Sequence, residues 1–361
     1  MTSFSPIRIG EGEPVDSFLW VRGDEPPFIA MAGGQTAPWA PATQRASGAG
    51  VHPDRDQAAR AAICEVLERQ SAFRLPRDAV LYGAGRELVR TAAPHVDIDL
   101  ETPGWWVLST PVGGGDPLAF PLEYVQFAPP VRNPLTDVRT DSTGMAVHLT
   151  HNRAVAGGLA ELTERTLRRQ LLAERVTVRW DVDTVTDDTA VYTRQLRRHG
   201  CRITLVPARS GDWWVCAALV SGTDPKGEER LVAGSAASHT PHAAADRALA
   251  EAYAKAYIAG LASRPGDVPD SVSCTSVTLR EAAGWLAEWG VNTASVVAVG
   301  GSQASLPTLC ADVPEDVFLV DRGDTYTDDV GLVCTHVFSP EHRSGMPESL
   351  AVHDLGWRLF G

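Results

Sequence analysis

Two copies of the motif Glu-x-x-Glu-Arg lie far apart in the 361-residue chain. In a helix, side chains at positions i, i+3 and i+4 lie on one face. Each motif therefore predicts a helix that presents two carboxylates and one guanidinium on the same side. A third segment repeats the i, i+4 spacing with Arg247 and Glu251. The two motifs consist of Glu65, Glu68 and Arg69, and of Glu161, Glu164 and Arg165.

These residue types suit the binding of a metal ion together with a nucleotide. Clustered carboxylates repel one another unless cations neutralise them. Magnesium prefers oxygen ligands and commonly bridges carboxylates to nucleotide phosphates, while arginine forms bidentate contacts with phosphate oxygens. Because the sequence contains no GxxxxGK[ST] loop, the motifs predict a metal–nucleotide site of another kind. The alternative is that they form exposed ion pairs on solvated helix faces.

Three predicted helices position these motifs. The first spans residues 54–73, the second spans 153–172, and the third starts at Thr240-Pro241 and ends near residue 261. Small residues flank both Glu-x-x-Glu-Arg motifs, so a neighbouring helix or a ligand could approach the backbone closely. The repetition of the motif and these small residues argue against the ion-pair alternative. The small residues include Ala58, Ala61, Ala62, Ala72, Ala154, Gly157, Gly158 and Ala160.

The remaining predicted elements are short and mix helix with strand. Residues 1–50 are rich in Gly, Pro and Ala, and we expect them to be irregular apart from one strand at 17–21. The mixture predicts an α/β or interleaved α+β protein. Further strands are predicted at 105–110, 118–127, 176–180, 190–192, 295–299, 317–320 and 332–338, a hairpin at 202–207 and 213–220, and helices at 193–199 and 279–289.

Composition restricts the class of protein. The net charge of −13 disfavours nucleic-acid binding, which needs a basic surface. There is no N-terminal signal and no apolar run long enough to span a membrane, so we expect a cytoplasmic protein. The six cysteines form no CxxC pair, which disfavours a zinc site. The only lysines are Lys226 and Lys255, so arginines, backbone amides or a metal must hold any phosphate.

Paired histidines and tryptophans are secondary candidates. Each HxxH pair precedes a motif helix, and although a transition-metal site is conceivable there, we expect these histidines to line or flank the predicted site. In each tryptophan pair, one ring should face the core and the other a surface or an interface. The pairs are His148 with His151, His239 with His242, Trp105 with Trp106, and Trp213 with Trp214.

The order of these segments resembles the YcaO family. Residues 61–71, which contain Glu65, look like the first nucleotide motif of that family. Ser142-Thr-Gly144 and the second Glu-x-x-Glu-Arg resemble its second motif, and residues 234–239 followed by Arg247 and Glu251 resemble its third. Residues 316–321 and 331–340 look like its late strands. The similarity therefore extends from residue 46 to residue 345.

The resemblance implies a YcaO-type fold with duplicated helix–sheet halves around a nucleotide cleft. One domain would cover residues 1–361, with an irregular segment at 1–45, a nucleotide-site core at 46–265 and a C-terminal part at 266–361. Family members use ATP and Mg²⁺ to activate a peptide backbone amide, forming an azoline, an amidine or a thioamide in ribosomally made peptides. The implied partners are a precursor peptide, a leader-binding protein and a second copy of the chain in a homodimer.

The resemblance also implies roles for individual residues. The four motif glutamates would bind magnesium, and basic and polar side chains would bind the nucleotide. No residue is identified as the nucleophile or as the base. The implied metal ligands are Glu65, Glu68, Glu161 and Glu164, and the implied nucleotide contacts are Arg69, Arg165, Arg247, Glu251, Ser142 and Arg153.

Several positions depart from the family pattern. Ala49 replaces the lysine of an early Gly-Lys-Gly, Ala61 replaces a serine, and Arg153 stands where the family has a glutamate that helps to hold metal. The proline-rich PxPxP tail of azoline-forming members is also missing. Two hypotheses follow. The first is an active amide-modifying enzyme, and the second is a degenerate pseudoenzyme that binds a precursor peptide or supports a partner enzyme.

Overall fold

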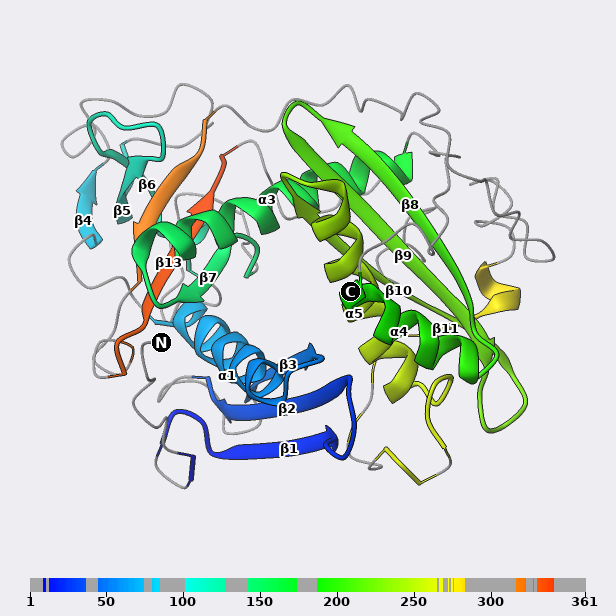
Figure 1. Ribbon diagram of the computed structural model, residues 1–361. Coiled ribbons are helices and arrows are strands. Elements are labelled where there is room, and N and C mark those ends of the chain that lie inside the picture. The colour runs from blue at the N-terminus through cyan, green and yellow to red at the C-terminus, as the bar shows by residue number, and fades with distance from the viewer. Residues whose placement is uncertain are drawn as a thin grey trace.

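The computed structural model describes most of the chain as three antiparallel sheets and the helices packed on them. Figure 1 shows the first sheet and the longest helices arranged around the middle of the molecule. None of the described helices combines the length and the hydropathy needed to cross a bilayer. The described residues are 9–10, 13–36, 45–74, 80–84, 101–126, 142–173, 187–264, 266–268, 272, 274, 276–282, 316–322, 327 and 330–340.

The first sheet consists of β1 (Ser17–Arg22), β2 (Phe28–Gln35) and β3 (Arg45–His52), in that order. Helix α1 (Arg55–Ala72) follows β3 directly and packs against it. The Asp54 carboxylate accepts a hydrogen bond from the Gln57 backbone N–H at 2.9 Å, so the predicted start of this helix is confirmed.

The expectation that residues 1–50 are irregular apart from one strand is wrong, because β2 and β3 lie there. Both strands are rich in Ala and Gly and lack the β-branched alternation that predicts a strand. Close packing explains the small residues. A Cβ added at Gly48 would lie 2.1 Å from the Ala62 carbonyl oxygen, so only glycine lets α1 approach β3 this closely.

The second sheet has the order β11 (Val277–Thr278), β10 (Glu229–Ser238), β9 (Trp213–Thr223) and β8 (Arg202–Ser210). Strands β8 and β9 form the predicted hairpin, and their turn contains Gly211 with a positive φ of 53°. Helix α5 (Pro241–Ile258) covers one face. Its predicted start is confirmed, because Thr240 caps it and Pro241 occupies its first turn.

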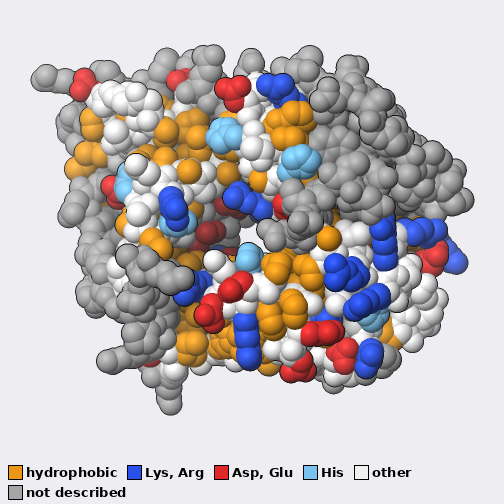
Figure 2. All heavy atoms as spheres, in the orientation of Figure 1, with side chains coloured by type: hydrophobic (Ala, Val, Ile, Leu, Met, Phe, Trp, Pro, Cys, Tyr) orange, Lys and Arg blue, Asp and Glu red, His pale blue; other side chains and the backbone are white. Residues whose placement is uncertain are grey.

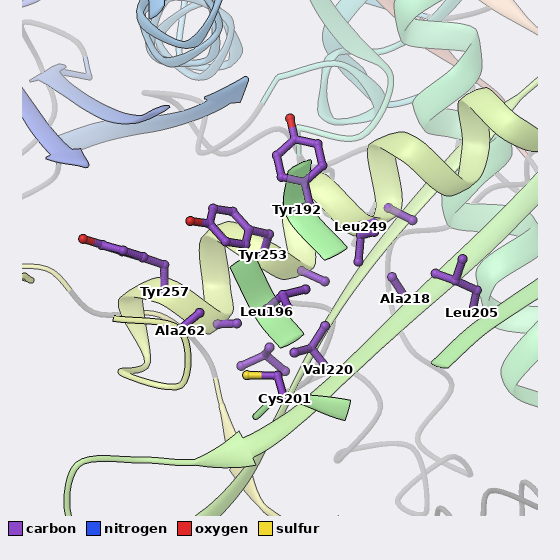
Figure 3. Packing of buried hydrophobic residues seen from close by; sticks show 14 of the residues in the cluster. Tyr192, Leu196, Cys201, Leu205, Ala218, Val220, Leu249, Tyr253, Tyr257 and Ala262 are labelled. Atoms are coloured by element: carbon purple, nitrogen blue, oxygen red, sulfur yellow. The ribbon is translucent and has the colours of Figure 1, made fainter. Parts of the chain in front are cut away.

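The core of this unit lies between α5, α4 (Asp187–Arg198) and the sheet. Figure 3 shows Tyr192 and Leu196 of α4 beside Tyr253 and Leu249 of α5. The prediction of a strand at 190–192 is wrong, because these residues belong to α4. Tyr192 and Leu196 are one helical turn apart, and both are buried against α5, so tertiary packing overrides local β preference.

The third sheet joins distant parts of the chain. Strand β6 (Leu118–Pro121) pairs with β5 (Pro103–Pro111). The prediction of one strand over 118–127 is wrong in its second half, where a 3₁₀ helix spans Leu122–Tyr124. Predictions for 176–180, 283–289 and 295–299 fall outside the described residues. The sheet has the order β4 (Val80–Ala84), β5 (Pro103–Pro111), β12 (Phe318–Asp321), β13 (Val333–Phe338) and β7 (Met145–His148), with β6 (Leu118–Pro121) alongside β5.

Helix α3 (His151–Ala173) connects the third sheet to the second (Figure 1). Leu162 packs against Val337 of β13, whereas Leu167 belongs to the cluster on the second sheet. The turn before β7 fits tightly under the helix. A Cβ on Gly144 would lie 1.8 Å from the Val337 carbonyl oxygen, and one on Gly158 would lie 2.3 Å from that of Gly144. The predicted role of small residues in close approach is confirmed here.

Buried Arg322 at the end of β12 ties this sheet to α1. Its guanidinium donates hydrogen bonds to the carbonyl oxygens of Ser71 and Val125, at 2.7 and 2.5 Å, and also to that of Arg74. Ser71 lies in the last turn of α1, where helical carbonyls lack intrahelical partners. Arg322 therefore caps α1 from a strand that is distant in sequence.

Candidate functional site

Helices α1, α3 and α5 lie around the middle of the molecule (Figure 1). Their glutamates are close enough to act on one another's charge. Figure 2 shows that the face towards the viewer is hollowed at its centre, with acidic and basic side chains in and around the hollow. Each helix follows a strand, and each uses a glutamate to contact the backbone of that strand or of its leading turn. The contacts are similar on the three helices.

Glu65 makes the contact on α1. Its Oε2 accepts a hydrogen bond from the Ala49 backbone N–H at 2.7 Å, and its Oε1 accepts one from Arg69 Nη2 at 2.6 Å. Arg69 also donates to the Ser47 carbonyl oxygen at 2.7 Å. The glutamate and arginine are one helical turn apart, as the motif predicts. Both side chains are partly exposed, so they remain accessible to a ligand.

Glu161 repeats the arrangement on α3. Its Oε2 accepts a hydrogen bond from the Gly144 backbone N–H at 3.1 Å, and its Oε1 lies 3.4 Å from Arg165 Nη2. Gly144 has a φ of 82°, which directs its N–H without steric cost. The Ser-Thr-Gly turn thus positions a motif glutamate through its glycine.

Glu251 repeats it once more on α5. Its Oε2 accepts a hydrogen bond from the Ser235 backbone N–H at 2.8 Å, and its Oε1 lies 2.9 Å from Lys255 Nζ. Lys255 therefore occupies the position on α5 that Arg69 and Arg165 occupy on α1 and α3. Lys255 was not predicted to belong to the site, although it follows Glu251 at the same i+4 spacing.

Two of the three strand–helix units also share their packing. A Cβ on Gly48 would meet the Ala62 oxygen and the Glu65 Cβ, at 2.1 and 2.9 Å. A Cβ on Gly234 would meet the equivalent atoms of Ala248 and Glu251, at 2.3 and 2.9 Å. In both units the residue after the glycine donates its N–H to the glutamate. The absence of a side chain brings strand and helix close enough for that bond.

Ser235 joins α3 to α5 within the site. Its hydroxyl donates a hydrogen bond to Glu164 Oε1 at 2.6 Å, while its N–H binds Glu251. Buried Arg168 lies 3.7 Å from the same Glu164 oxygen and donates to the Ser235 hydroxyl at 3.3 Å. Neither residue was predicted to have a role in the site, although Ser235 lies within residues 234–239 of the predicted third motif. Arg168 follows Glu164 at i+4, and this spacing is the one sequence signal for it.

The carboxylates are close enough to interact electrostatically across helices. Burial raises the pKa of Glu65, and Glu251 on α5 adds to that rise. Burial, followed by the charges of Glu161 and Glu65, raises the pKa of Glu68 well above its usual range. Burial also raises the pKa of Glu164, with a further contribution from Glu251. A cation among these groups would offset both burial and repulsion.

This donor set fits the predicted ligands. Carboxylate oxygens are the ligands that magnesium prefers, and the neighbouring arginines suit phosphate. In the described part of the chain, no three acidic, histidine or cysteine side chains already converge as a preformed metal cage. Magnesium commonly keeps several waters and shares phosphate oxygens, so an all-protein cage is not required.

The structure does not place every predicted residue in this cluster. Arg153 is exposed in the first turn of α3, two turns before Glu161. Burial lowers the pKa of His148, and the charge of Arg153 lowers it further. The Ser142 carbonyl accepts a hydrogen bond from the Met145 N–H in the turn before β7. Arg247 is exposed one turn before Glu251. The nucleotide-binding roles of these three residues remain predictions.

The paired histidines lie at the starts of the helices α3 and α5. His151 Nε2 is 3.0 Å from Asp321 Oδ1, and His239 Nδ1 is 3.3 Å from the Asp212 carbonyl oxygen. One tryptophan of each pair is buried, as predicted: Trp106 is fully buried and Trp213 largely so. A binding role for the other rings remains a prediction.

Comparison with protein families identifies the chain. Residues 49–341 match the family described as YcaO cyclodehydratase, ATP- and Mg²⁺-binding. The chain belongs to the YcaO family. The match spans all three motif helices and the strands β12 and β13. A comparison with curated protein sequences gave no match.

Solved structures share the YcaO fold with this chain. A heterocyclase in complex with substrate and cofactor has a TM-score of 0.67 and 16% identity over 92% of this chain, which spans 50% of that protein. The YcaO protein of Methanopyrus kandleri, bound with AMPPCP and Mg²⁺, has a TM-score of 0.62 and 18% identity over 92% of this chain and 90% of its own. The E. coli microcin synthetase McbBCD complex gives 0.53 and 14%, over 90% and 87%.

The predicted fold class and family are therefore confirmed. The description of the YcaO family agrees with the predicted cofactors, ATP and Mg²⁺. The division of the chain into an N-terminal segment, a core and a C-terminal part stays a prediction, as do the roles of individual site residues.

Proposed function

We propose that this YcaO protein uses ATP and magnesium to activate a peptide backbone amide during maturation of a ribosomally made peptide. The observation that carries the proposal is the convergence of Glu65, Glu161 and Glu251, each fixed by a backbone N–H and paired with a cation at i+4. Such a cluster of opposite charges suits a metal-bound polyphosphate better than it suits a purely structural core.

The four motif glutamates would bind the magnesium. Glu68 and Glu164 lie one turn along from Glu65 and Glu161, and burial raises the pKa of both. Magnesium would supply the positive charge that neutralises them and the phosphate oxygens. Glu65 and Glu161 already have their Oε2 atoms fixed by backbone N–H groups, so these carboxylates are oriented before any ligand arrives.

The basic side chains would bind the phosphates. Arg69 and Arg165 each hold a motif glutamate in place and can turn a second N–H towards phosphate oxygens. Arg247 would add a contact from the exposed face of α5, and Glu251 would orient the cations beside it. Ser142, in the turn before β7, and Arg153, in the first turn of α3, would contact the nucleotide.

The reaction would convert the amide oxygen, a poor leaving group, into phosphate, a good one. A nucleophile on the peptide adds to the amide carbonyl carbon, and the carbonyl oxygen becomes an oxyanion. That oxyanion takes the terminal phosphoryl group of ATP and releases ADP. The phosphorylated oxygen then leaves as phosphate, while the nitrogen loses its proton and forms a double bond to the former carbonyl carbon. For a neighbouring Cys, Ser or Thr nucleophile, the product is an azoline. Such transfers need positioning and charge neutralisation more than covalent help from the protein.

The precursor peptide is the proposed substrate, and a leader-binding protein is the proposed partner. Among the structural neighbours, the McbBCD complex has also been solved with pro-MccB17 bound, which supports a peptide substrate and an assembly of several proteins. A homodimer is a further expectation that follows from the family.

Nucleotide binding is the first test. We expect calorimetric titration with AMPPCP and Mg²⁺ to show binding to the wild type, and the double variant Glu65→Gln, Glu164→Gln to lose it. Removing two ligand charges should weaken binding at least about hundredfold. Glu229→Gln, which changes an exposed glutamate on β10, is the matched control and should bind normally. Absence of binding in every protein would contradict the proposal.

The second candidate is a pseudoenzyme with a weakened nucleotide site, and Arg153 favours it. This arginine brings positive charge to a position where the family pattern has a metal-holding glutamate. We expect Arg153→Glu to reduce ATP turnover if Arg153 contacts phosphate in an active enzyme. A sharp rise in turnover would instead mean that the native site has decayed. The measurement is phosphate release in the presence of candidate precursor peptides.

A further inference from the structure

Helix α5 carries a row of three charges along one face. Arg247, Glu251 and Lys255 follow one another at i, i+4 and i+8, so they lie above one another on the helix. Neighbouring residues between them, including Ala248 and Ala252, are buried against the second sheet. Arg247 is exposed, whereas Glu251 contacts the backbone of β10 through Ser235, so the row begins at the surface and continues beside the edge of the sheet.

The row differs from its counterparts on α1 and α3 in charge. Those helices carry a second glutamate three residues after the first, Glu68 and Glu164, whereas α5 has buried Ala254 at that position. On α5 one carboxylate stands between two cations. The site-facing residues of α1 and α3 are thus rich in carboxylates and suit metal, while those of α5 are one carboxylate and one lysine, with exposed Arg247 one turn away, and suit phosphate.

Lys255 is the last residue of this row and lies one turn after Glu251 on α5. Its Nζ is 2.9 Å from Glu251 Oε1, and its side chain is only 18% exposed. Its charge acts on Glu65 of α1, and the charge of Glu251 acts on both Glu65 and Glu164. Lys255 is therefore near the carboxylates of α1 as well as that of α5, although α1 and α5 are far apart in the sequence.

We propose that Lys255 binds the polyphosphate chain of the nucleotide, as the α5 counterpart of Arg69 and Arg165. This inference rests on the proposed function. An ammonium carries three N–H groups and can contact a carboxylate and a phosphate oxygen together. Glu251, fixed by the Ser235 N–H, holds the ammonium in place before the nucleotide arrives. The negatively charged phosphate oxygens would then face Lys255 on α5, and the bound magnesium would face the glutamates of α1 and α3.

The lysine content of the chain allows a direct test on the wild-type protein. Lys226 and Lys255 are the only lysines, and Lys226 lies in the turn between β9 and β10. The probe is ATP that bears an acyl group on its terminal phosphate, which transfers that group to a nearby amine and releases ATP. We expect peptide mass spectrometry to find acylation of Lys255 that excess ATP and Mg²⁺ suppress. Acylation confined to Lys226, or insensitive to ATP, would overturn the inference.

Variants provide the second measurement. We expect Lys255→Met to weaken binding of AMPPCP and Mg²⁺ roughly ten- to hundredfold, the loss of one charged contact. Lys255→Arg should restore most of it, and Lys226→Met should match the wild type. Thermal unfolding without nucleotide checks that each variant is folded. Normal affinity in folded Lys255→Met would overturn the inference and leave the proposed function standing, whereas absence of binding in the wild type would overturn both.

Discussion

At the residue scale, Ser235 has two separate contacts with the acidic cluster. Its N–H orients Glu251 and its hydroxyl orients Glu164, so one residue fixes carboxylates on two helices. The motif glutamates and arginines could be predicted because their spacing within one helix is visible in the sequence. Ser235, by contrast, contacts Glu164 across 71 positions of chain, and no local pattern reports such a contact.

The two contacts of Ser235 can be separated by substitution. Ser235→Ala removes the hydroxyl bond to Glu164 but keeps the backbone bond to Glu251. A hydrogen bond to a charged group contributes roughly 1.5–3 kcal/mol, so we expect magnesium-dependent nucleotide binding to weaken about tenfold or more. Titration with AMPPCP at several Mg²⁺ concentrations measures it. Ser238→Ala, at the end of the same strand, is the control, and an equal loss there would refute the role of Ser235.

At the element scale, the motif helices were predictable and the strands beneath them were not. Asp54 and the Thr240-Pro241 pair mark helix starts through local chemistry. Strands β2, β3 and β10 are rich in Ala, Gly and Ser, which have low strand preference on their own. They are strands because helices α1 and α5 pack on them at a distance that larger side chains would prevent. This constraint comes from tertiary packing. It leaves no alternation of apolar and polar residues in the sequence.

Close approach of strand and helix is itself testable at Gly234. We expect Gly234→Ala to lower the free energy of unfolding by about 1–3 kcal/mol, because its Cβ would lie 2.3 Å from the Ala248 carbonyl oxygen. It should also weaken nucleotide binding, since α5 must move away from Ser235. Gly113→Ala is the control, as no heavy atom lies within 4 Å of its added Cβ. Urea unfolding of both variants measures the difference, and equal stabilities would contradict the packing argument.

At the scale of the whole molecule, the site depends on contacts that the sequence separates widely. Arg322 caps α1 from β12, and α3 reaches from the third sheet to the second. The fold class followed from the mixture of predicted helices and strands, but the pairing of β5 with β12 and of β13 with β7 did not. Strand partners so far apart in sequence are chosen by the global fold.

The partly buried acidic cluster gives the metal-free protein a characteristic pH dependence. The folded-state pKa values of Glu65, Glu68 and Glu164 are raised above their usual 4.5. Between 4.5 and the raised values, the folded state binds more protons than the unfolded state, so these groups lower stability as pH rises. We expect Glu68→Gln to become increasingly more stable than the wild type as pH rises from 4.5, measured by urea unfolding in a chelator. A stability difference between Glu68→Gln and the wild type that does not change with pH would contradict this.

The order of the three motif helices along the chain has a consequence for synthesis. Helices α1 and α3 leave the ribosome before β10 and α5, which end at residue 258. Until then Glu164 lacks its contact with the Ser235 hydroxyl, and the site lacks the pair of Glu251 and Lys255. If the cleft binds a nucleotide as proposed, a growing or truncated chain could not do so. Cellular ATP would then stabilise only chains translated past α5.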